Sequence, residues 1–577
     1  MECAMLDHRA TKRSAWFWYE EKRQSERHID RRHGELDVRA GICRQWRIAS
    51  LIALAGGSLL AACTVAESAP TAPPSAQKVA SCEALTGMAL KHGRVDAAIS
   101  LAGGAMVNVE AGKPGLPAPA AFCRVKATLS PVAGSTIKVE VWLPERANWN
   151  GKLLGAGNGG FGTNLLLPSL LMRGAVQKGY AAVGTDMGHF GESDVDGSWA
   201  LNAPEKIRDY GWRANHLGAE TARQVIAAFY EGPLASSYFY GCSDGGREAL
   251  TLAQRYPVDY DAIIAGAPAM PWTRLASAFA GNAVAAEKPG ADLSLSKLKL
   301  LQTASLGQCD GLDGVKDGVI EDPRNCHVNP AKLVCKGGDS AECLTSDEVA
   351  TAKLLYDGPK TPDGKSFYPG FAPGAEAEEG TWAMWLTGSN SQHAKFGTAF
   401  FRYFVHSNPD WQLSDFNLER DYTLAKARVG DDLDADQPDL GAFFNRGGKL
   451  ILYHGWNDPG IPAQNTVDYY ERVVAANPRA AATSVRLFMV PGMSHCIAGP
   501  GPDIFDPLTP LDSWRQGGAA PERIIATKYD NDLFAFVGLP AKAGRTRPLC
   551  AFPKVAKWDG KGPTDDAASF ACEAPIK

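Results

Sequence analysis

The sequence has no strong excess of charge of either sign, which argues against a partner that is itself highly charged. Its 577 residues carry 59 Lys and Arg against 64 Asp and Glu, giving a net charge of −5. Nucleic-acid-binding proteins usually carry a clear basic excess. We therefore expect no nucleic-acid partner.

The sequence also lacks any two cysteines at C-x-x-C spacing, although it contains 13 cysteines. Structural zinc sites usually need such close pairs, so zinc is not expected. Cys3 and Cys43 precede a predicted cleavage site, and Cys63 is a predicted lipidation site, which leaves ten others. An even number of cysteines in an exported protein is typical of a disulfide framework, here of five bridges.

The apolar run Ile48–Ala62 is too short to span a bilayer. It follows Arg44 and Arg47 and ends in Leu-Ala-Ala-Cys63, which resembles a bacterial lipoprotein signal with Cys63 as the lipid-anchored first mature residue. An ordinary secretory signal cut nearby is the alternative. Both predict export, to the periplasm, to the outer membrane as a lipoprotein, or out of the cell.

A chain of this length is too long for one compact core. Residues 1–63 are predicted to be an N-terminal extension plus the signal, and residues 64–81 a disordered tether rich in Pro, Ala and Ser. Beyond them, apolar runs ending in glycine-rich turns alternate with helical patterns, except between about residues 270 and 445. This alternation predicts a parallel sheet with right-handed crossovers.

The predicted elements frame the interruption. Strands are expected within residues 136–145, 152–162, 179–189, 236–241, 260–268, 447–460 and 484–496, and helices within 216–231, 247–257 and 465–477. The interpretation is an α/β domain in two parts, 82–269 and 446–577, with an inserted lid domain over 270–445.

Residues 241–245, Gly-Cys-Ser-Asp-Gly, fit the G-x-S-x-G pattern of a nucleophilic serine. A predicted strand precedes Ser243 and a predicted helix follows it. A sharp turn between them needs small residues two before and two after the serine, and it presents the hydroxyl at a helix N-terminus whose N–H groups can hold an oxyanion. The sequence therefore predicts a nucleophile elbow.

A nucleophilic serine needs a base, and the base needs an acid that orients it. Asp458 and His495 follow the last two predicted strands, in the chain order serine, acid, histidine that α/β-hydrolases use. His454 competes with His495, but it lies inside a strand end and is interpreted as a packed histidine. Asp503 competes with Asp458, but it follows the histidine.

The residue before Ser243 and the residue after His495 are both cysteines. If the serine and histidine share a hydrogen bond, Cys242 and Cys496 come close enough for a disulfide. We therefore predict a bridge that holds the base against the nucleophile.

Several long strings resemble the tannase and feruloyl esterase family from about Cys82 to the C-terminus: GCSDGGREAL, RYPVDYDAIIAGAPA, CDGLDGVKDGVIEDP, RGGKLILYHGWNDPGIP, VPGMSHCIAGPGPD and RTRPLC. The resemblance implies an α/β-hydrolase fold with a large inserted lid, and a triad of Ser243, His495 and Asp458. It implies an oxyanion hole from the backbone N–H groups of Gly160 and Asp244. It also implies the disulfides Cys82–Cys123, Cys242–Cys496, Cys309–Cys326, Cys335–Cys343 and Cys550–Cys572.

Three aspartates of the loop 309–323, Asp310, Asp313 and Asp317, lie close in sequence with glycines between them. Hard oxygen ligands on a tight loop suit Ca²⁺, although the spacing is not that of an EF-hand, and a solvated acidic turn is an equal alternative from the residues alone. The family resemblance implies a structural calcium in the lid, with ligands Asp310, Asp313, Val315, Asp317 and Val319, the valines through their carbonyls. No redox or nucleotide cofactor is implied.

The leading hypothesis is an exported serine esterase for small aromatic esters of the feruloyl, galloyl or terephthaloyl type. Most lid aromatics are expected to fill the lid core, while a few could hold the aromatic acid. Arg402 lies roughly where one family member has an arginine for a free carboxylate, although a surface position is the simpler interpretation. The alternatives are a surface calcium-binding lipoprotein without catalysis, and a peptidase on the same fold.

Overall fold

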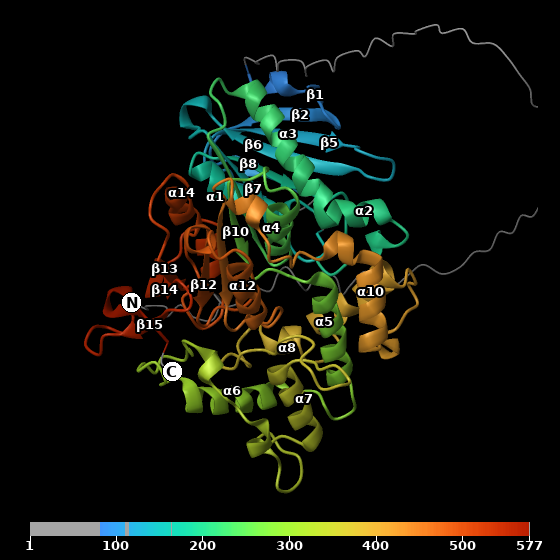
Figure 1. Ribbon diagram of the computed structural model, residues 1–577, viewed down its shortest axis with the longest axis vertical. Coiled ribbons are helices and arrows are strands. Elements are labelled where there is room, and N and C mark those ends of the chain that lie inside the picture. The colour runs from blue at the N-terminus through green and yellow to red at the C-terminus, as the bar shows by residue number, and fades with distance from the viewer. Residues whose placement is uncertain (1–80, 110–114, 163, 576–577) are drawn as a thin grey trace, which may run out of the picture. The chain divides into compact units, whose positions relative to one another are not determined.

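The structure is a computed structural model that describes residues 81–109, 115–162 and 164–575 (Figure 1). These residues belong to one compact unit of the chain, Pro74–Lys577. The predicted signal with Cys63, and the predicted tether up to residue 80, lie outside the described residues. No helix in the described part is both long and apolar enough to cross a membrane.

A ten-stranded sheet forms the centre of this unit, in the order β1-β2-β5-β6-β8-β7-β9-β10-β11-β12. Its strands are β1 (Ala89–Leu90), β2 (Gly93–Leu101), β5 (Phe122–Leu129), β6 (Ile137–Pro144), β7 (Lys152–Ala156), β8 (Ala181–Thr185), β9 (Ser236–Cys242), β10 (Ala262–Gly266), β11 (Lys449–Gly455) and β12 (Val485–Val490). The strands β1, β2, β5 and β6 pair antiparallel, as β6 does with β8. All pairs from β8 to β12 are parallel, which confirms the predicted parallel sheet.

The strand order reverses between β8, β7 and β9, because the chain crosses from β7 to β8 on one side and then returns to β9 on the other. In open α/β sheets, ligands bind beyond the carboxyl ends of the strands at such a reversal. The loops after β7 and β9 are therefore expected to form the site.

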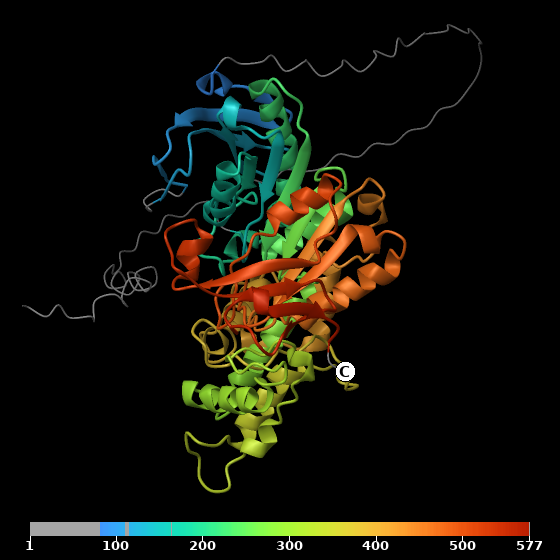
Figure 2. The ribbon, with the colours of Figure 1, turned by 90° about the vertical axis from the view of Figure 1, so that its left-hand side faces the viewer.

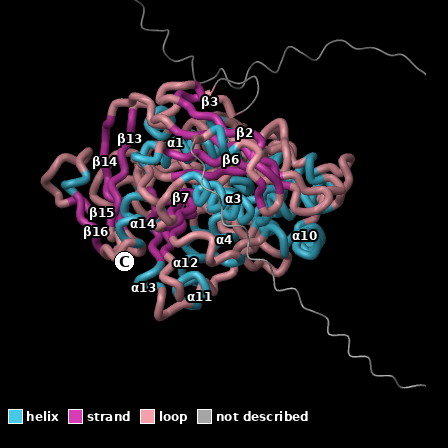
Figure 3. Tube along the Cα trace, turned by 90° about the horizontal axis from the view of Figure 1, so that it is seen from above, coloured by secondary structure: helices cyan, strands magenta, loops and turns pink. Residues whose placement is uncertain are grey.

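Helices cover both faces of the parallel strands (Figure 3). They are α1 (Leu166–Gln177) and α14 (Leu508–Arg515) on one face, and α3 (Ala214–Phe229), α4 (Asp244–Arg255) and α12 (Gln464–Ala476) on the other. Successive strand residues point to opposite faces. Thus Leu153 and Val183 share a core with α3, whereas Leu154 and Ala182 share a core with α1.

The chain between β10 and β11 is helical and adds no strand to the sheet. It contains α5 (Trp272–Ala286), α6 (Leu295–Cys309), α7 (Ser346–Asp357), α8 (Trp382–Trp385), α9 (Gln392–Ala399), a π-helical turn η8 (Phe400–Val405), α10 (Leu418–Leu433) and α11 (Gly441–Phe444). The group α5, α9, η8 and α10 shares a hydrophobic core with α3 of the α/β part. The helices α6, α7 and α8 form a separate core, away from β1 and β2 in Figures 1 and 2.

The C-terminal part adds two antiparallel hairpins beside β12 (Figure 2). Their elements are β13 (Arg523–Tyr529), α15 (Asp532–Phe536), β14 (Ala543–Cys550), β15 (Val555–Trp558) and β16 (Phe570–Glu573). The remaining elements are short: β3 (Met106–Val107), β4 (Leu116–Pro117), α2 (Pro204–Arg208), the π-helical turn η5 (Asp209–Arg213), α13 (Ala481–Ser484) and several 3-10 turns.

Candidate active site

Ser243 lies at the sharp turn from β9 to α4, in a backbone conformation with φ 64° and ψ −122° that non-glycine residues rarely adopt. The flanking glycines permit the turn. A Cβ at Gly241 would lie 2.3 Å from the carbonyl oxygen of Gly245, and a Cβ at Gly245 would lie 2.8 Å from that of Asn158. The strand, the strained serine and the helix together have the geometry expected of a nucleophile elbow.

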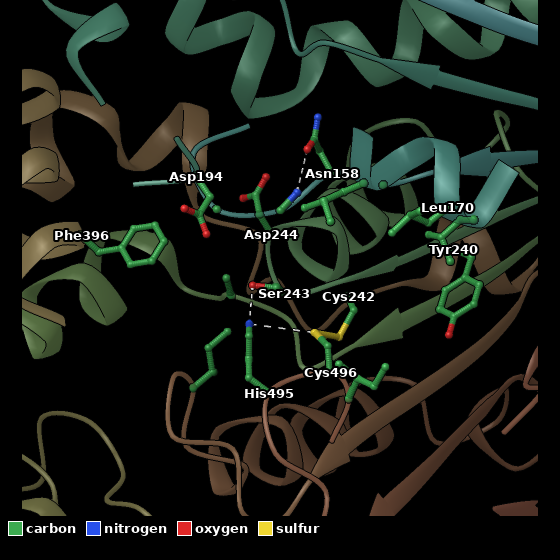
Figure 4. A pocket seen from close by; sticks show the side chains of 18 of the residues that line it. Asn158, Leu170, Asp194, Tyr240, Cys242, Ser243, Asp244, Phe396, His495 and Cys496 are labelled. Atoms are coloured by element: carbon green, nitrogen blue, oxygen red, sulfur yellow. Dashed lines mark hydrogen bonds between the residues drawn. A yellow bond between two sulfur atoms is a disulfide. The ribbon is translucent and has the colours of Figure 1, made fainter. Parts of the chain in front are cut away.

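Three loops bring a serine, a histidine and an aspartate into one hydrogen-bonded row, of which Figure 4 shows the serine and the histidine. The Nε2 atom of His495 lies 2.9 Å from the Oγ atom of Ser243. Its Nδ1 atom lies 2.7 Å from Oδ2 of Asp458. Asp458 follows β11 and His495 follows β12, so both lie beyond carboxyl ends of parallel strands. This row can move a proton from the serine to the imidazole while the carboxylate holds the ring.

The Asp458 carboxylate is buried and fully hydrogen-bonded. Its Oδ1 accepts hydrogen bonds of 2.8 Å from the backbone N–H groups of Gly460 and Ile461, and its Oδ2 contacts both His495 and His454. Burial alone would raise its pKa, but the charge of His495 and the hydrogen bonds from both histidines hold the pKa of Asp458 well below its usual range. The acid is therefore ionised at all pH values at which an imidazole could act as a base.

His454 is buried, as expected of a packed histidine, but it also touches the site. Its Nε2 atom lies 3.1 Å from Asp458 Oδ2 and 2.9 Å from the carbonyl oxygen of Ile461, and its Nδ1 atom lies 2.7 Å from the Thr466 hydroxyl. Asp503, the other competing residue, does not contact His495. Its carboxylate accepts a hydrogen bond of 2.6 Å from the N–H of Ala498.

A disulfide joins Cys242 to Cys496, with Cα atoms 6.1 Å apart, next to the serine and the histidine (Figure 4). Sequence reasoning anticipated this bridge from the neighbouring cysteines. The structure contains the four other pairs that the family resemblance implies: Cys82–Cys123, Cys309–Cys326, Cys335–Cys343 and Cys550–Cys572. Of the five bridges, Cys242–Cys496 closes the largest loop, because its two cysteines are 254 positions apart.

The loop after β7 brings Gly160 to the opening beside Ser243, with a positive φ of 57°. Among the described residues, neither the backbone N–H of Gly160 nor that of Asp244 donates a hydrogen bond to another protein group. Asp244 is the first residue of α4, where N–H groups have no partner within the helix. These two groups can therefore donate to an oxygen atom bound next to Ser243.

A buried polar network fixes the two candidate donors. The Tyr210 hydroxyl lies 2.9 Å from the carbonyl oxygen of Gly160 and 2.8 Å from Oδ1 of Asp244. The fully buried Arg247 pairs with Asp244 at 2.6 Å and donates to the carbonyl oxygens of Tyr210 and Gly211. Sequence reasoning missed Tyr210 and Arg247, because no local pattern links the η5 turn to the elbow.

A cavity of about 300 Å³ opens over Ser243. One side is lined by aromatic and aliphatic residues of the inserted segment and its neighbours, including Trp272, Phe279, Trp385 and Phe396. The Trp385 ring packs edge-on against the His495 ring, with centroids 5.0 Å apart. The cavity is thus mostly apolar, with the reacting groups at its centre.

Arg402 lies away from this cavity. Its Nε donates a hydrogen bond of 2.6 Å to the carbonyl oxygen of Trp411, and its side chain lines a second, more polar cavity of about 520 Å³ together with Lys395 and Glu287. The family resemblance suggested Arg402 as a ligand for a substrate carboxylate, with a surface position as the alternative. The structure does not bring it to Ser243, and we do not propose it as a substrate ligand.

In the acidic loop 309–323, aspartate side chains accept hydrogen bonds from backbone N–H groups of the same loop. Asp310 accepts from the N–H groups of Asp317 and Gly318, while Asp313 accepts from that of Val315. Burial, with the charges of Asp317 and Asp310, raises the pKa of Asp313 to about 6. A cation would relieve this concentration of negative charge, so the oxygen donors fit Ca²⁺.

Two further observations define the ligand set that an ion would need. Among the described residues, no three Asp, Glu, His or Cys side chains are arranged around one point where a metal ion could be held. Asp317 is also paired with Arg545 at 2.8 Å and with Arg547 at 2.5 Å. The carbonyls of Val315 and Val319 would have to complete the ligand set.

Comparisons with known proteins agree on one family. A family model described as tannase and feruloyl esterase matches residues 123–573. An uncharacterized esterase of Xanthomonas campestris is 37% identical over 495 residues, covering 78% of this chain and 84% of that protein. Mono(2-hydroxyethyl) terephthalate hydrolase of Piscinibacter sakaiensis is 34% identical over 503 residues, covering 76% of this chain and 82% of that protein.

A solved structure extends the likeness to the fold. The crystal structure of feruloyl esterase B from Aspergillus oryzae superposes with a TM-score of 0.75 at 26% identity, covering 85% of this chain and 100% of that one. The predicted α/β-hydrolase fold is thereby confirmed.

Proposed function

Because this chain belongs to the tannase and feruloyl esterase family, and is therefore a carboxylic ester hydrolase, we propose that it cleaves esters of aromatic acids with Ser243 as the nucleophile. The observation that carries the proposal is the row of hydrogen bonds from Ser243 through His495 to Asp458 inside an apolar cavity. A chain with a non-catalytic binding role would have no need of this row.

In the first half of the reaction, the Ser243 Oγ attacks the ester carbonyl carbon while His495 Nε2 takes the serine proton. The carbonyl oxygen becomes an oxyanion, which the N–H groups of Gly160 and Asp244 stabilise. The bond from carbon to the alcohol oxygen then breaks. His495 returns the proton to that oxygen, and the free alcohol leaves an acyl-serine.

In the second half, water attacks the acyl-serine and gives one proton to His495 Nε2. The bond from carbon to the Ser243 Oγ breaks, and the serine recovers the proton from His495. Asp458 remains ionised throughout and stabilises the imidazolium. The products are the free acid and the alcohol, with no net change in the enzyme.

We assign the acyl group to the side of the cavity formed by Trp272, Phe279, Trp385 and Phe396. Flat aromatic side chains favour an aromatic ring through stacked and edge-on contacts. Three of these residues lie in α5 and α8, and the fourth lies in α9. All four belong to the proposed lid, residues 270–445, which interrupts an α/β domain with the proposed parts 82–269 and 446–577. The lid would therefore set the specificity for the acid.

The proposal is tested by acid release from methyl ferulate, methyl gallate and mono(2-hydroxyethyl) terephthalate. The protein would comprise residues 64–577, produced with its disulfides formed, beside a Ser243→Ala variant. We expect hydrolysis of at least one ester, and a fall in kcat of at least about 10⁴-fold in the variant. Equal activity of the two proteins would contradict the assignment of Ser243 as the nucleophile. Absence of hydrolysis of all three esters would contradict the proposed class of aromatic acids.

We further propose that the protein is exported, as a lipoprotein anchored through Cys63 or as a released protein. Five disulfides support an oxidising compartment. Metabolic labelling with a palmitate analogue, in the wild type and in Cys63→Ala, separates the two routes. Labelling that depends on Cys63 supports the anchor, and labelling of neither protein supports release.

We also propose a structural Ca²⁺ bound by Asp310, Asp313 and Asp317 with the carbonyls of Val315 and Val319. The support is the raised pKa of Asp313 and the family resemblance of the loop. Such an ion would supply positive charge that neutralises the loop. It lies outside the proposed reaction, so its role would be stability.

A further inference from the structure

The cavity over Ser243 has a second side that the reaction does not use. Leu167, Leu170 and Leu171 of α1 line it, together with Leu533 and Phe536 of α15. Figure 4 places Phe396 on one side of Ser243 and Leu170 with Tyr240 on the other. Leu170 of α1 therefore lies opposite the aromatic side proposed for the acid, and we name the five residues of α1 and α15 the α1–α15 wall.

The wall is apolar and unusually exposed. Leu533 is 58% exposed, Leu167 45% and Phe536 39%, and no residue of α15 is buried. All five described residues of the wall have uncharged hydrocarbon side chains that line the cavity. Contiguous exposed apolar surface on a monomer commonly marks a binding site.

The base of this side carries no ionic charge. Tyr240 and Tyr453 lie there with their hydroxyls 3.4 Å apart. Burial raises the pKa of Tyr240 to about 12, so its phenol stays neutral. A neutral tyrosine pair offers ring faces and edges to a ligand and no ionic charge.

The wall is fixed to the body of the protein. Arg173 of α1 donates a hydrogen bond of 3.0 Å to the carbonyl oxygen of Val537, directly after α15. Asn531 accepts from the N–H of Phe534 at 3.0 Å and so caps the start of α15, while Lys528 pairs with Asp532. These contacts hold α15 in the conformation in which Leu533 and Phe536 are exposed.

We propose that the α1–α15 wall is the subsite for the alcohol part of the ester, and that it selects an apolar alcohol, aryl-alkyl or long alkyl, over a sugar or a polyol. The proposal rests on the proposed function, because the acid occupies the other side of the cavity. An ester carbonyl held at Ser243 has its acid on one side and its alcohol on the other. With the acid against the lid aromatics, the alcohol extends along the wall.

The expected preference is sizeable. Each methylene buried against apolar surface is worth up to about fourfold in binding. Methanol and 2-phenylethanol have similar acidity, so the intrinsic reactivity of their esters hardly differs. An aromatic ring on the alcohol would cover Leu533 and Phe536, which in the free protein face water.

The test compares three esters of one aromatic acid, made with methanol, 2-phenylethanol and glycerol. The acid is the one that the wild type releases fastest from its methyl ester. We expect kcat/KM to be at least about tenfold higher for the 2-phenylethyl ester than for the methyl and glyceryl esters. The double variant Leu533→Asn with Phe536→Asn should lower the 2-phenylethyl to methyl ratio about tenfold.

Phe534→Asn is the matched control. Phe534 lies on the same short helix and is 45% exposed, but it does not line the cavity. It should keep the 2-phenylethyl to methyl ratio within about twofold of the wild-type value. The methyl ester measured on each variant reports that the protein is folded.

Three results would overturn the subsite: equal kcat/KM for the three esters, a preference for the glyceryl ester, or an equal loss of the ratio in Phe534→Asn. In each of these cases the wild type still hydrolyses the methyl ester, and the proposed function stands. Absence of hydrolysis of every ester would overturn the proposed function and the subsite together.

Discussion

At the scale of single residues, the site depends on one buried carboxylate that serves two imidazoles. Asp458 Oδ2 lies 2.7 Å from His495 and 3.1 Å from His454, while Oδ1 is held by two backbone N–H groups. An asparagine amide at position 458 could accept hydrogen bonds through its single oxygen only. Its NH₂ group would then face either the histidines or the backbone N–H groups, which the carboxylate oxygens now contact. The ring of His495 would then lose the partner that sets its tautomer.

Asp458→Asn should therefore lower kcat about 10³- to 10⁴-fold with little change in KM. Asp259→Asn is a matched control, since Asp259 lies 2.7 Å from His216 in a part-buried pair, and neither residue lines the cavity over Ser243. The control should lower the melting temperature without lowering kcat. A similar kcat in Asp458→Asn and in the wild type would contradict the assigned acid.

The same carboxylate gives a pH signature of stability. The pKa of Asp458 is lowered in the folded protein, so its ionised form stabilises the fold above its ordinary pKa of about 4. This contribution is lost as the pH falls below that value towards the folded-state pKa. The difference in melting temperature between the wild type and Asp458→Asn should thus narrow as the pH is lowered from about 5 to below about 4.

We propose that Tyr210 is a positioning residue rather than a catalytic one. Its hydroxyl contacts the residues whose N–H groups are proposed to hold the oxyanion, Gly160 and Asp244. Tyr210→Phe should lower kcat about 10- to 100-fold with KM little changed, because the loss affects only the charged transition state. Tyr230→Phe removes a comparable buried bond, to the carbonyl oxygen of Pro144 at 2.7 Å, and should leave kcat unchanged. Equal kcat values in the two variants would exclude this role.

The sequence allowed Ser243, Asp458 and His495 to be chosen as candidates because each follows a strand-like run and two of them neighbour a cysteine. Tyr210 and Arg247 carried no such signal. Their contacts join the η5 turn, the glycine loop and the first turn of α4, which come together only in the folded chain. His454 was expected to be buried, but its bond to Asp458 depends on a turn of four residues that a strand pattern does not reveal.

At the scale of elements, the insertion between β10 and β11 and the glycine loop after β7 share one aromatic cluster. Phe161, next to Gly160, is fully buried and stacks on Phe404 of η8 with ring centroids 5.1 Å apart. It also contacts Phe396 and Trp272 at 5.2 and 5.8 Å. The inserted segment therefore supports the glycine loop from behind, in addition to lining the cavity.

Phe404→Ala should remove this support. We expect a loss of stability of about 3–5 kcal/mol, as for other buried phenylalanines, and a fall in kcat of at least about tenfold. Phe401→Ala is the control, because Phe401 is equally buried but packs on Trp411 and Phe416. Urea unfolding and ester hydrolysis measured together should show similar losses of stability and a loss of kcat in Phe404→Ala alone.

Most strands of the parallel sheet could be predicted from the sequence, since runs such as Ala262–Gly266 are apolar throughout and end in glycine turns. The strand Gly93–Leu101 was not predicted, because most of its residues are exposed or half-buried and the apolar alternation is weak. The helices of the insertion were not predicted one by one. Their apolar residues meet partners in α3 and the glycine loop as well as each other, so no clean amphipathic period remains.

At the scale of the whole molecule, the acidic loop ties the insertion to the C-terminal hairpins. Asp317 pairs with Arg545 and Arg547, and Glu321 accepts from the N–H of Ala556 at 2.7 Å. An ion in this loop would stabilise contacts between parts of the chain that are more than 200 positions apart. Its removal should lower the stability of the protein as a whole.

We expect a chelator to lower the melting temperature by several degrees and added Ca²⁺ to restore it. Asp313→Asn should melt lower in calcium and no longer respond to the chelator. Asp363→Asn, which changes a highly exposed aspartate on a turn of the insertion, should respond as the wild type does. A melting temperature that is indifferent to the chelator in all three proteins would contradict the calcium site.

The order of strands has a consequence for how the chain is made. The neighbours β10 and β11 pair along five residues, from Ala262 with Lys449 to Gly266 with Tyr453. A ribosome working at about 5–20 residues per second needs roughly 10–40 s to synthesise the chain that separates them. During that interval one edge of β10 has no partner, and Ser243 has no His495 beside it. The newborn chain is thus both inactive and prone to aggregate until its last quarter emerges, and a premature stop codon before Lys449 would produce an insoluble fragment rather than a weak enzyme.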